Sequence, residues 1–301
     1  MNDEYVESME ALFHPLSYFL AYEYEEKLKL SSSVVSTGFA NIDSVIGGGL
    51  QPGLYMLFGI NGIGKNTLLM QIAENLALQK YVSLIINTED KLHSLIPQFL
   101  SRQSFRNDPQ TAISQFNVPN EILKNPQWFQ DVEESLHSMI SFIGWIEEKY
   151  LDSKRVEEII DFQFKRDDKL VVFINSQVFS PLQRDRELVK SKLQNLKYLI
   201  RKYQIPIILM YNLSLEDYLS LTEGKSVIDD IEQLADTSLL LQPNRLNILL
   251  KDSQYRLPLY NSLSDNDSML YELFIRKQKS GIQKQRVYLT FYPQFGFFQE
   301  G

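Results

Sequence analysis

The chain has 301 residues, a hydrophobic fraction of 44% and a net charge of −8. This length is sufficient for one large hydrophobic core. The absence of cysteine excludes disulfides and thiolate metal sites and favours an intracellular location. No apolar run of about 18 residues occurs, so we expect no membrane-spanning segment, and an acidic N-terminus without a basic region is unlike a signal peptide.

The first predicted element is an acidic helical arm over residues 1–30. Apolar residues such as Val6, Met9 and Leu12 recur there close to the helical period, and Pro15 predicts a kink. Seven acidic residues and two lysines give this arm −5 of the chain's net charge of −8. An arm of this kind packs either on its own core or on a neighbouring subunit, and the sequence leaves both possibilities open.

Strand and helix patterns then alternate along residues 31–301. Apolar runs predict strands at Leu54–Phe58, Val82–Asn87, Leu170–Ile174, Ile207–Met210, Ser238–Leu241 and Leu270–Lys277. Helices are expected from about Thr67 to Gln79, through a polar region at 91–165 with apolar spacing at Phe129, Val132, Leu136, Met139 and Ile140, and at about 184–203.

The end of the chain has the pattern of a β-hairpin, with strands at Arg286–Phe291 and Gly296–Gln299. Alternating strands and helices predict an α/β fold with a mostly parallel central sheet covered by helices. No linker rich in Pro, Gly or Ser divides residues 31–301, so we expect one nucleotide-binding domain there, preceded by the arm.

The strongest local signal is a glycine-rich loop between a predicted strand and a predicted helix. Its candidate phosphate-binding residues are Gly59, Asn61, Gly62, Ile63, Gly64, Lys65, Asn66 and Thr67. In a P-loop, or Walker A motif, glycines let backbone N–H groups wrap a phosphate, and a lysine reaches the β- and γ-phosphates. The spacing of glycines and lysine is intact here, whereas Asn66 occupies the position of the hydroxyl that ligates Mg²⁺.

Further segments carry a family resemblance. They are Ser36 to Asp43 (STGFANID), Gly47 to Gly53 (GGGLQPG), Gln71 to Asn75 (QIAEN), Gln204 to Leu213, Ile231 to Asp236 (IEQLAD), Ile275 to Gly281 (IRKQKSG) and Val287 to Phe291. In this order, over about residues 34–300, they resemble the RecA-like core of DnaB-type replicative helicases and RadA-type recombination ATPases. The resemblance implies a RecA-like P-loop NTPase fold, ATP or ADP as ligand, Mg²⁺ as cofactor, and a ring or filament of identical subunits.

The resemblance also assigns catalytic candidates by position. Glu89 matches the glutamate that activates the attacking water, and a carboxylate suits that role. A solvated glutamate after a strand is the alternative interpretation. Asn212 occupies the place of a phosphate-sensing glutamine. Lys277 and Lys279 match a basic pair that reaches the neighbouring subunit's nucleotide, Lys279 replacing an arginine and keeping its charge but not its bidentate geometry.

The positions at which this sequence departs from the family pattern are mainly those that support the metal. Asn175 ends a predicted strand where the family places the aspartate that holds the water shell of Mg²⁺. With Asn66 in place of the hydroxyl, both protein groups that support the metal are replaced by neutral amides. This combination predicts slow or absent hydrolysis.

Single-stranded DNA is the partner that the resemblance implies, and the charge pattern argues against it. The predicted loop at 213–230 has five acidic residues against a single lysine, Lys225, whereas a loop that follows a phosphate backbone should be basic. Residues 242–268 add Arg245, Lys251 and Arg256, either as compensation or as part of a variable surface insertion.

Two hypotheses from different classes follow. In one, the chain is an active ATP-dependent motor on single-stranded DNA. In the other, it is a nucleotide-binding scaffold or regulator that acts by assembly or by partnering another ATPase or replication protein. Either would serve DNA replication, recombination or mobile-element maintenance.

Overall fold

The structure is a computed structural model, and it describes residues 34–88, 92–148, 151–175, 186–225, 227–243, 268–278 and 285–301. The expected arm at 1–30, the candidates Glu89 and Lys279, and the basic residues Arg245, Lys251 and Arg256 lie outside the described residues. Ser36–Gly301 form one compact unit. The predicted domain boundary after residue 30 stays a prediction.

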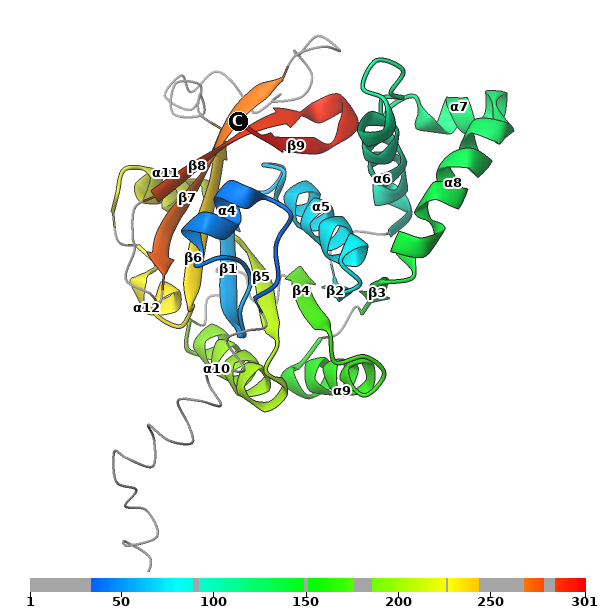
Figure 1. Ribbon diagram of the computed structural model, residues 1–301. Helices are drawn as coiled ribbons and strands as arrows, with labels where there is room; N and C mark the ends of the chain where they lie inside the picture. The colour runs from blue at the N-terminus through cyan, green and yellow to red at the C-terminus, as the bar shows by residue number, and fades with distance from the viewer. Residues whose placement is uncertain are drawn as a thin grey trace, which may run out of the picture. The chain divides into compact units, whose positions relative to one another are not determined.

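The described strands form a single nine-stranded sheet in the order β3-β2-β4-β5-β1-β6-β7-β8-β9 (Figure 1). Their bounds are β1 Gly53–Gly59, β2 Val82–Asn87, β3 Ile143–Glu147, β4 Leu170–Asn175, β5 Pro206–Asn212, β6 Thr237–Pro243, β7 Met269–Gln278, β8 Gln285–Tyr292 and β9 Phe297–Glu300. The six strands from β3 to β6 pair in parallel, and β6 to β9 pair antiparallel. The predicted α/β fold with a mostly parallel sheet and a C-terminal hairpin is confirmed.

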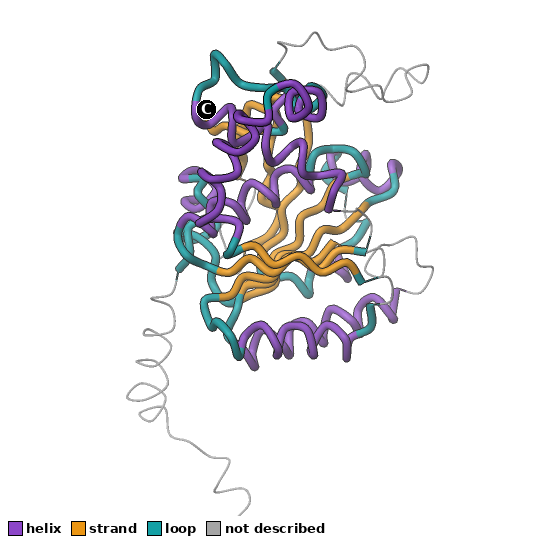
Figure 2. The backbone as a smooth tube through the Cα atoms, turned by 90° about the vertical axis from the view of Figure 1, so that its right-hand side faces the viewer, coloured by secondary structure: helices purple, strands orange, loops and turns teal. Residues whose placement is uncertain are grey.

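Helices cover both faces of the sheet, as the edge-on view in Figure 2 shows. The described helices are α4 Ala40–Val45, α5 Lys65–Leu78, α6 Leu92–Asn107, α7 Val118–Lys124, α8 Pro126–Ile140, α9 Ser153–Phe164, α10 Arg186–Tyr203, α11 Leu215–Thr222, α12 Asp229–Glu232 and the 3₁₀ turn Pro293–Phe295. Coverage on both faces explains why strands β1, β2, β4 and β5 are buried along their whole lengths and read as continuous apolar runs.

Helix α5 lies over the sheet and is buried nearly all round. The helical pattern predicted for residues 129–140 corresponds to α8, whose Val132, Leu136 and Met139 pack with Leu100 of α6 and Ala77 of α5. Helices α6 to α8 therefore form a small second core on the outer side of α5.

Two expectations from the sequence are wrong. The region 91–165 is not entirely helical, because β3 at Ile143–Glu147 pairs with β2 at the edge of the sheet. The segment 213–230 is not a plain loop, because Leu215–Thr222 form α11, which Ser214 caps by accepting a hydrogen bond from Asp217 N. Among the described helices, none is both long and apolar enough to cross a membrane.

The predicted hairpin is formed by β8 and β9, joined by the turn Pro293–Phe295 and by Gly296 in the left-handed conformation (φ 56°). Phe295 and Phe298 of this hairpin are buried, and Phe105 of α6 stacks on Phe295 with ring centroids 4.5 Å apart. Phe298 stacks on Phe291 at 4.3 Å.

Candidate nucleotide-binding site

The glycine-rich loop connects the end of β1 to the start of α5. β1 ends at Gly59 and α5 begins at Lys65. Gly62 and Gly64 have φ values of 78° and 92°, which favour glycine. A Cβ atom on Gly64 would also lie 3.3 Å from the ring of Phe298, and one on Gly59 would lie 3.0 Å from Ile63 Cγ2. The chain therefore needs glycine at these turns of the loop.

Lys65 lies where this loop passes into α5, and its side chain is only 5% exposed. Its ammonium group donates hydrogen bonds to the carbonyls of Gly59 at 3.0 Å and of Ile60 at 2.8 Å. The loop backbone surrounds this buried cation at the N-terminal end of a 14-residue helix. Positive charge and backbone N–H groups at a helix N-terminus favour the binding of a phosphate group. Asn61 and Gly62 are exposed at the outer edge of the loop, whereas Ile63 is buried beneath it.

Asparagines end three neighbouring parallel strands beside the loop. Asn87 ends β2, Asn175 ends β4 and Asn212 ends β5, and all three are buried. Asn87 and Asn175 are direct partners in the sheet, and Asn212 pairs with Gly59 of the loop. Because the carboxyl ends of parallel strands meet at one edge of a sheet, these amides share the edge that carries the loop.

Asn66 contacts one of these residues directly. The side-chain amide of Asn175 donates to Asn66 Oδ1 at 3.4 Å. The hydroxyl of the adjacent Thr67 instead donates to Gln98 Oε1 of α6, also at 3.4 Å. The Thr67 hydroxyl is thus directed toward α6. Asn66 and Asn175, the two positions expected to support a metal, are hydrogen-bonded to each other as a neutral pair.

A pocket lies beside this pair. Its lining is mostly apolar, and consists of Leu69, Met70, Ile85, Leu95, Trp145, Phe173 and Met210 together with Asn66, Asn87 and Asn175. The polar side chains in this lining are therefore amides and the indole of Trp145, and none of them carries a charge.

These residues do not fit a Mg²⁺ site. In P-loop ATPases a hydroxyl ligates the ion directly and a carboxylate holds its water shell. Here both positions are amides that hydrogen-bond to each other, so the negative charge that would hold the water shell is missing from them. Within the described part of the chain, no three or more His, Cys, Asp or Glu side chains gather in a way that could hold a metal.

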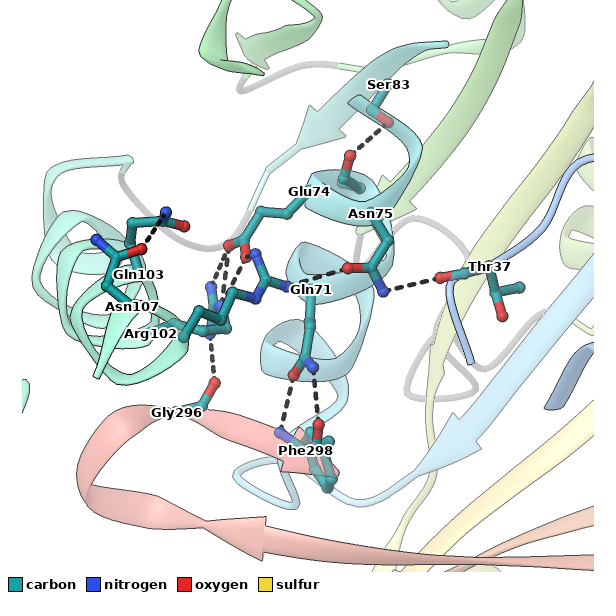
Figure 3. Close-up of polar contacts among 12 residues, drawn as sticks. Thr37, Gln71, Glu74, Asn75, Ser83, Arg102, Gln103, Asn107, Gly296 and Phe298 are labelled. Atoms are coloured by element: carbon teal, nitrogen blue, oxygen red, sulfur yellow. Dashed lines mark hydrogen bonds and ion pairs between the residues drawn. The ribbon is translucent and has the colours of Figure 1, made fainter. Parts of the chain in front are cut away.

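Polar side chains of α5 also connect the loop's helix to distant segments (Figure 3). The side chain of Gln71 makes two hydrogen bonds with the backbone of Phe298 in β9. It donates to the Phe298 carbonyl at 2.7 Å and accepts from the Phe298 N–H at 2.8 Å. Asn75 donates to the carbonyl of Thr37 at 3.0 Å. Helix α5 is thereby attached to segments near both ends of the compact unit Ser36–Gly301.

An ion-pair cluster, Glu74–Arg102–Arg106, joins α5 to α6. Glu74 and Arg102 are each 1% exposed, and Arg102 Nη2 lies 2.7 Å from Glu74 Oε1. Arg106 binds the other carboxylate oxygen at 2.8 Å, and Arg102 also donates to the carbonyl of Gly296. Burial lowers the pKa of Arg106 despite the attraction of Glu74. Both charges of the buried pair are thus compensated within the cluster.

The cluster was not predictable as such from the sequence. The available signal was the placement of Gln71, Glu74 and Asn75, three polar residues at positions i, i+3 and i+4 in the part of α5 that is otherwise apolar after its first turn. Polar groups on one stripe of a buried helix require partners. Their partners lie 28 or more residues away along the chain and could not be named from the sequence.

Lys277 makes its described contacts within its own chain. Its ammonium group donates to the carbonyls of Glu232, Gln233 and Ala235 at 3.3, 2.8 and 2.7 Å. These contacts occupy all three N–H donors of a lysine. Burial is the main reason that the pKa of Lys277 is lowered. Its predicted contact with a neighbour's phosphates stays a prediction and requires the release of these carbonyls.

The acidic segment 213–230 is partly neutralised by the basic helix α10. Lys190 lies 3.1 Å from Asp230 Oδ2 and Arg186 lies 3.6 Å from Asp230 Oδ1. Lys225 pairs with Glu223 at 2.8 Å. Two basic residues of α10 and the lysine of the segment itself are thus engaged with carboxylates of the same chain.

Comparison with known proteins adds a family match. The model of the DnaB-like helicase C-terminal domain matches residues 34–300. Two curated relatives are DNA repair proteins RadA from two strains of Helicobacter pylori, 37% identical over 76 residues and 30% identical over 122 residues. These matches cover 25% and 40% of this chain but only 16% and 26% of the relatives' lengths.

Solved structures share the fold at low sequence identity. One of them, an ATPase domain, has a TM-score of 0.69 at 14% identity, with 96% of this chain and 99% of that chain covered. A DnaB-like replicative helicase, described with its interactions with primase, has a TM-score of 0.67 at 15% identity, with 95% and 67% covered. A KaiC-like protein from Pyrococcus horikoshii has a TM-score of 0.55 at 15% identity, with 89% and 98% covered.

Proposed function

Because the chain belongs to the family of DnaB-like helicase C-terminal domains, we propose that it binds ATP or ADP at Gly59–Thr67 and hydrolyses ATP slowly or not at all. Its role in this proposal is that of a nucleotide-dependent scaffold or regulator. It assembles with copies of itself, in a ring or filament, or partners another ATPase or a replication protein.

One observation carries the proposal. The loop retains what nucleotide binding needs, a buried Lys65 at the N-terminal end of α5 within a glycine turn. The two positions that hydrolysis needs for its metal are the hydrogen-bonded amides Asn66 and Asn175. Phosphoryl transfer depends on the metal to neutralise charge that develops on the leaving group. The loop therefore supports nucleotide binding, whereas the two amide positions do not support ATP hydrolysis.

The biological setting follows by analogy with relatives. The curated relatives are DNA repair proteins, and one structural neighbour is a replicative helicase described with primase. By this analogy the chain serves DNA replication, recombination or mobile-element maintenance. The proposal does not include direct binding of single-stranded DNA, because residues 213–230 are acidic and would repel its phosphates. Arg186 and Lys190 of α10 are also paired with Asp230 of this segment.

The second candidate is an active motor on single-stranded DNA. The intact spacing of Gly59, Gly64 and Lys65 and the presence of Glu89 favour it. In that case Glu89 activates the attacking water, Asn212 senses the phosphate, and Lys277 and Lys279 act on the adjacent subunit's nucleotide.

Measurement of ATP binding and ATP hydrolysis by the purified protein, with and without single-stranded DNA, separates the two candidates. The scaffold proposal predicts that a labelled ATP analogue binds and that DNA does not stimulate turnover. Turnover stimulated by DNA to about 1 s⁻¹ or faster, in the range of ordinary enzymes, would support the motor instead.

A further inference from the structure

The nucleotide site is bordered by neutral amides on the side where a metal would be expected. Asn87, Asn175 and Asn212 end three adjacent strands, and Asn66 lies in the first turn of α5. The Asn66–Asn175 hydrogen bond joins two of them, and both line one pocket with Asn87.

Amides and carboxylates act oppositely on the two ligands of such a site. A carboxylate attracts a divalent cation and repels the oxygens of a phosphate, so it favours a phosphate only when the cation is present. An amide has no charge and offers two N–H donors, which a phosphate oxygen accepts directly. Amides at the edge that carries Lys65 therefore provide an environment for an anion that needs no counter-cation.

The remainder of the pocket supports the same conclusion. Its other lining side chains are aliphatic or aromatic and supply no oxygen ligand to a cation. The hydroxyl of Thr67, which follows Asn66 in the sequence, donates a hydrogen bond to Gln98 on α6. A dehydrated divalent ion would gain little at this position, because Mg²⁺ loses water reluctantly and prefers charged oxygen ligands.

We propose that this site binds its nucleotide without a divalent cation, Lys65 providing the positive charge and the amides of Asn66 and Asn175 donating to phosphate oxygens. The inference rests on the proposed function, since it assumes that the loop binds a nucleotide. It goes further by specifying the chemical form of the ligand: the free nucleotide, where an ordinary P-loop ATPase takes the magnesium complex.

The test is equilibrium binding of a fluorescent ATP analogue to the full chain, once with excess Mg²⁺ and once with EDTA. We expect the dissociation constants in Mg²⁺ and in EDTA to agree within about twofold. The reason is that the site offers no protein ligand to Mg²⁺, so removing the ion breaks no contact with the protein. Binding that is about tenfold or more weaker in EDTA would overturn the inference. Binding that is lost in Lys65→Ala under both conditions locates the analogue in the loop.

A charge substitution provides the second arm of the test. Asn175→Asp places a carboxylate beside the phosphates, so we expect weaker binding in EDTA and recovery with Mg²⁺. Asn120→Asp adds the same charge on the exposed surface of α7, which packs on α6 and α8, and should leave both constants unchanged. Equal constants for Asn175→Asp in the two conditions would overturn the inference. Absence of any binding that depends on Lys65 would instead overturn the proposed function itself.

Discussion

Lys65 is the residue on which nucleotide binding should depend most. Its ammonium group is buried and donates to two carbonyls of its own loop, so it can exchange these neutral partners for phosphate oxygens. A hydrogen bond between an ammonium group and a phosphate is stronger than one to a neutral carbonyl. Loss of a charge-assisted contact of this kind costs about 1.5–3 kcal/mol.

We predict that Lys65→Ala weakens binding of a labelled ATP analogue at least about tenfold, which corresponds to about 1.4 kcal/mol. Lys124→Ala, an exposed position at the end of α7, is the matched control and should bind as the unmodified protein does. Fluorescence titration gives both constants. Equal affinity in the two variants would remove the assignment of Gly59–Thr67 as the phosphate site.

Single residues also mark where sequence-based prediction ends. Motif positions alone predict that Asn66 and Asn175 occupy the two positions where the family supports its metal. Their mutual hydrogen bond was not predictable, because the two residues are 109 positions apart and meet only through the packing of α5 on the sheet. Lys277 is a similar case, since three carbonyls at and just after the end of α12 hold its side chain.

At the scale of secondary-structure elements, α5 is the helix that connects the loop to the rest of the fold. Gln71 attaches it to β9, and the pair Glu74–Arg102 attaches it to α6 (Figure 3). Arg106 of α6 completes this cluster. Helix α6 begins shortly after Glu89 in the sequence. The cluster therefore connects the helix of the phosphate loop to the helix that follows the proposed catalytic glutamate.

We predict that Arg102→Ala destabilises the protein by about 3–5 kcal/mol, because it leaves the carboxylate of Glu74 buried with one of its two charged partners removed. The control is Lys154→Ala, which breaks an exposed pair with Glu158 and should change stability by no more than about 0.5 kcal/mol. Urea denaturation measures both. Equal stabilities for the two variants would show that the cluster contributes nothing to the attachment of α6.

The strands show which elements a sequence can reveal. Strands β1, β2, β4 and β5 are buried on both faces, so their apolar runs stand out and their predicted bounds differ by at most a few residues from those observed. Strand β3 is only partly buried at the edge of the sheet, contains Gly144 and follows a strongly amphipathic helix. Its five residues have no clear period, and the helical pattern around them concealed it.

At the scale of the whole molecule, the family resemblance predicts assembly through a basic pair, Lys277 and Lys279. Lys277 donates to carbonyls at the end of α12 within its own chain, whereas Lys279 lies outside the described residues. The contacts of Lys277 indicate that it contributes to the stability of the folded chain. Its substitution should therefore change stability as well as assembly.

We predict that the protein self-associates in the presence of an ATP analogue, and that Lys279→Ala weakens this association without lowering the thermal unfolding midpoint. Lys277→Ala should lower that midpoint, because three backbone carbonyls lose their donor. Light scattering and thermal unfolding give the two quantities. A strict monomer at every nucleotide condition would rule out the predicted assembly.

By the proposed function, this chain retains a nucleotide site and lacks the groups that would make it a fast ATPase. The variant Asn66→Thr with Asn175→Asp restores the hydroxyl and carboxylate of an ordinary P-loop site. If each position is worth about 1–2 kcal/mol at the transition state, hydrolysis should rise by an order of magnitude or more. Adding Glu89→Gln should remove that gain while leaving ATP binding in place.

The most direct measurement is therefore the steady-state rate of ATP hydrolysis by the unmodified protein and by this double variant, side by side with Mg²⁺ present. We expect a slow or undetectable rate for the unmodified protein and a clear increase for the variant. Turnover of about 1 s⁻¹ or faster by the unmodified protein, or a double variant that binds ATP and gains no activity, would contradict the claim.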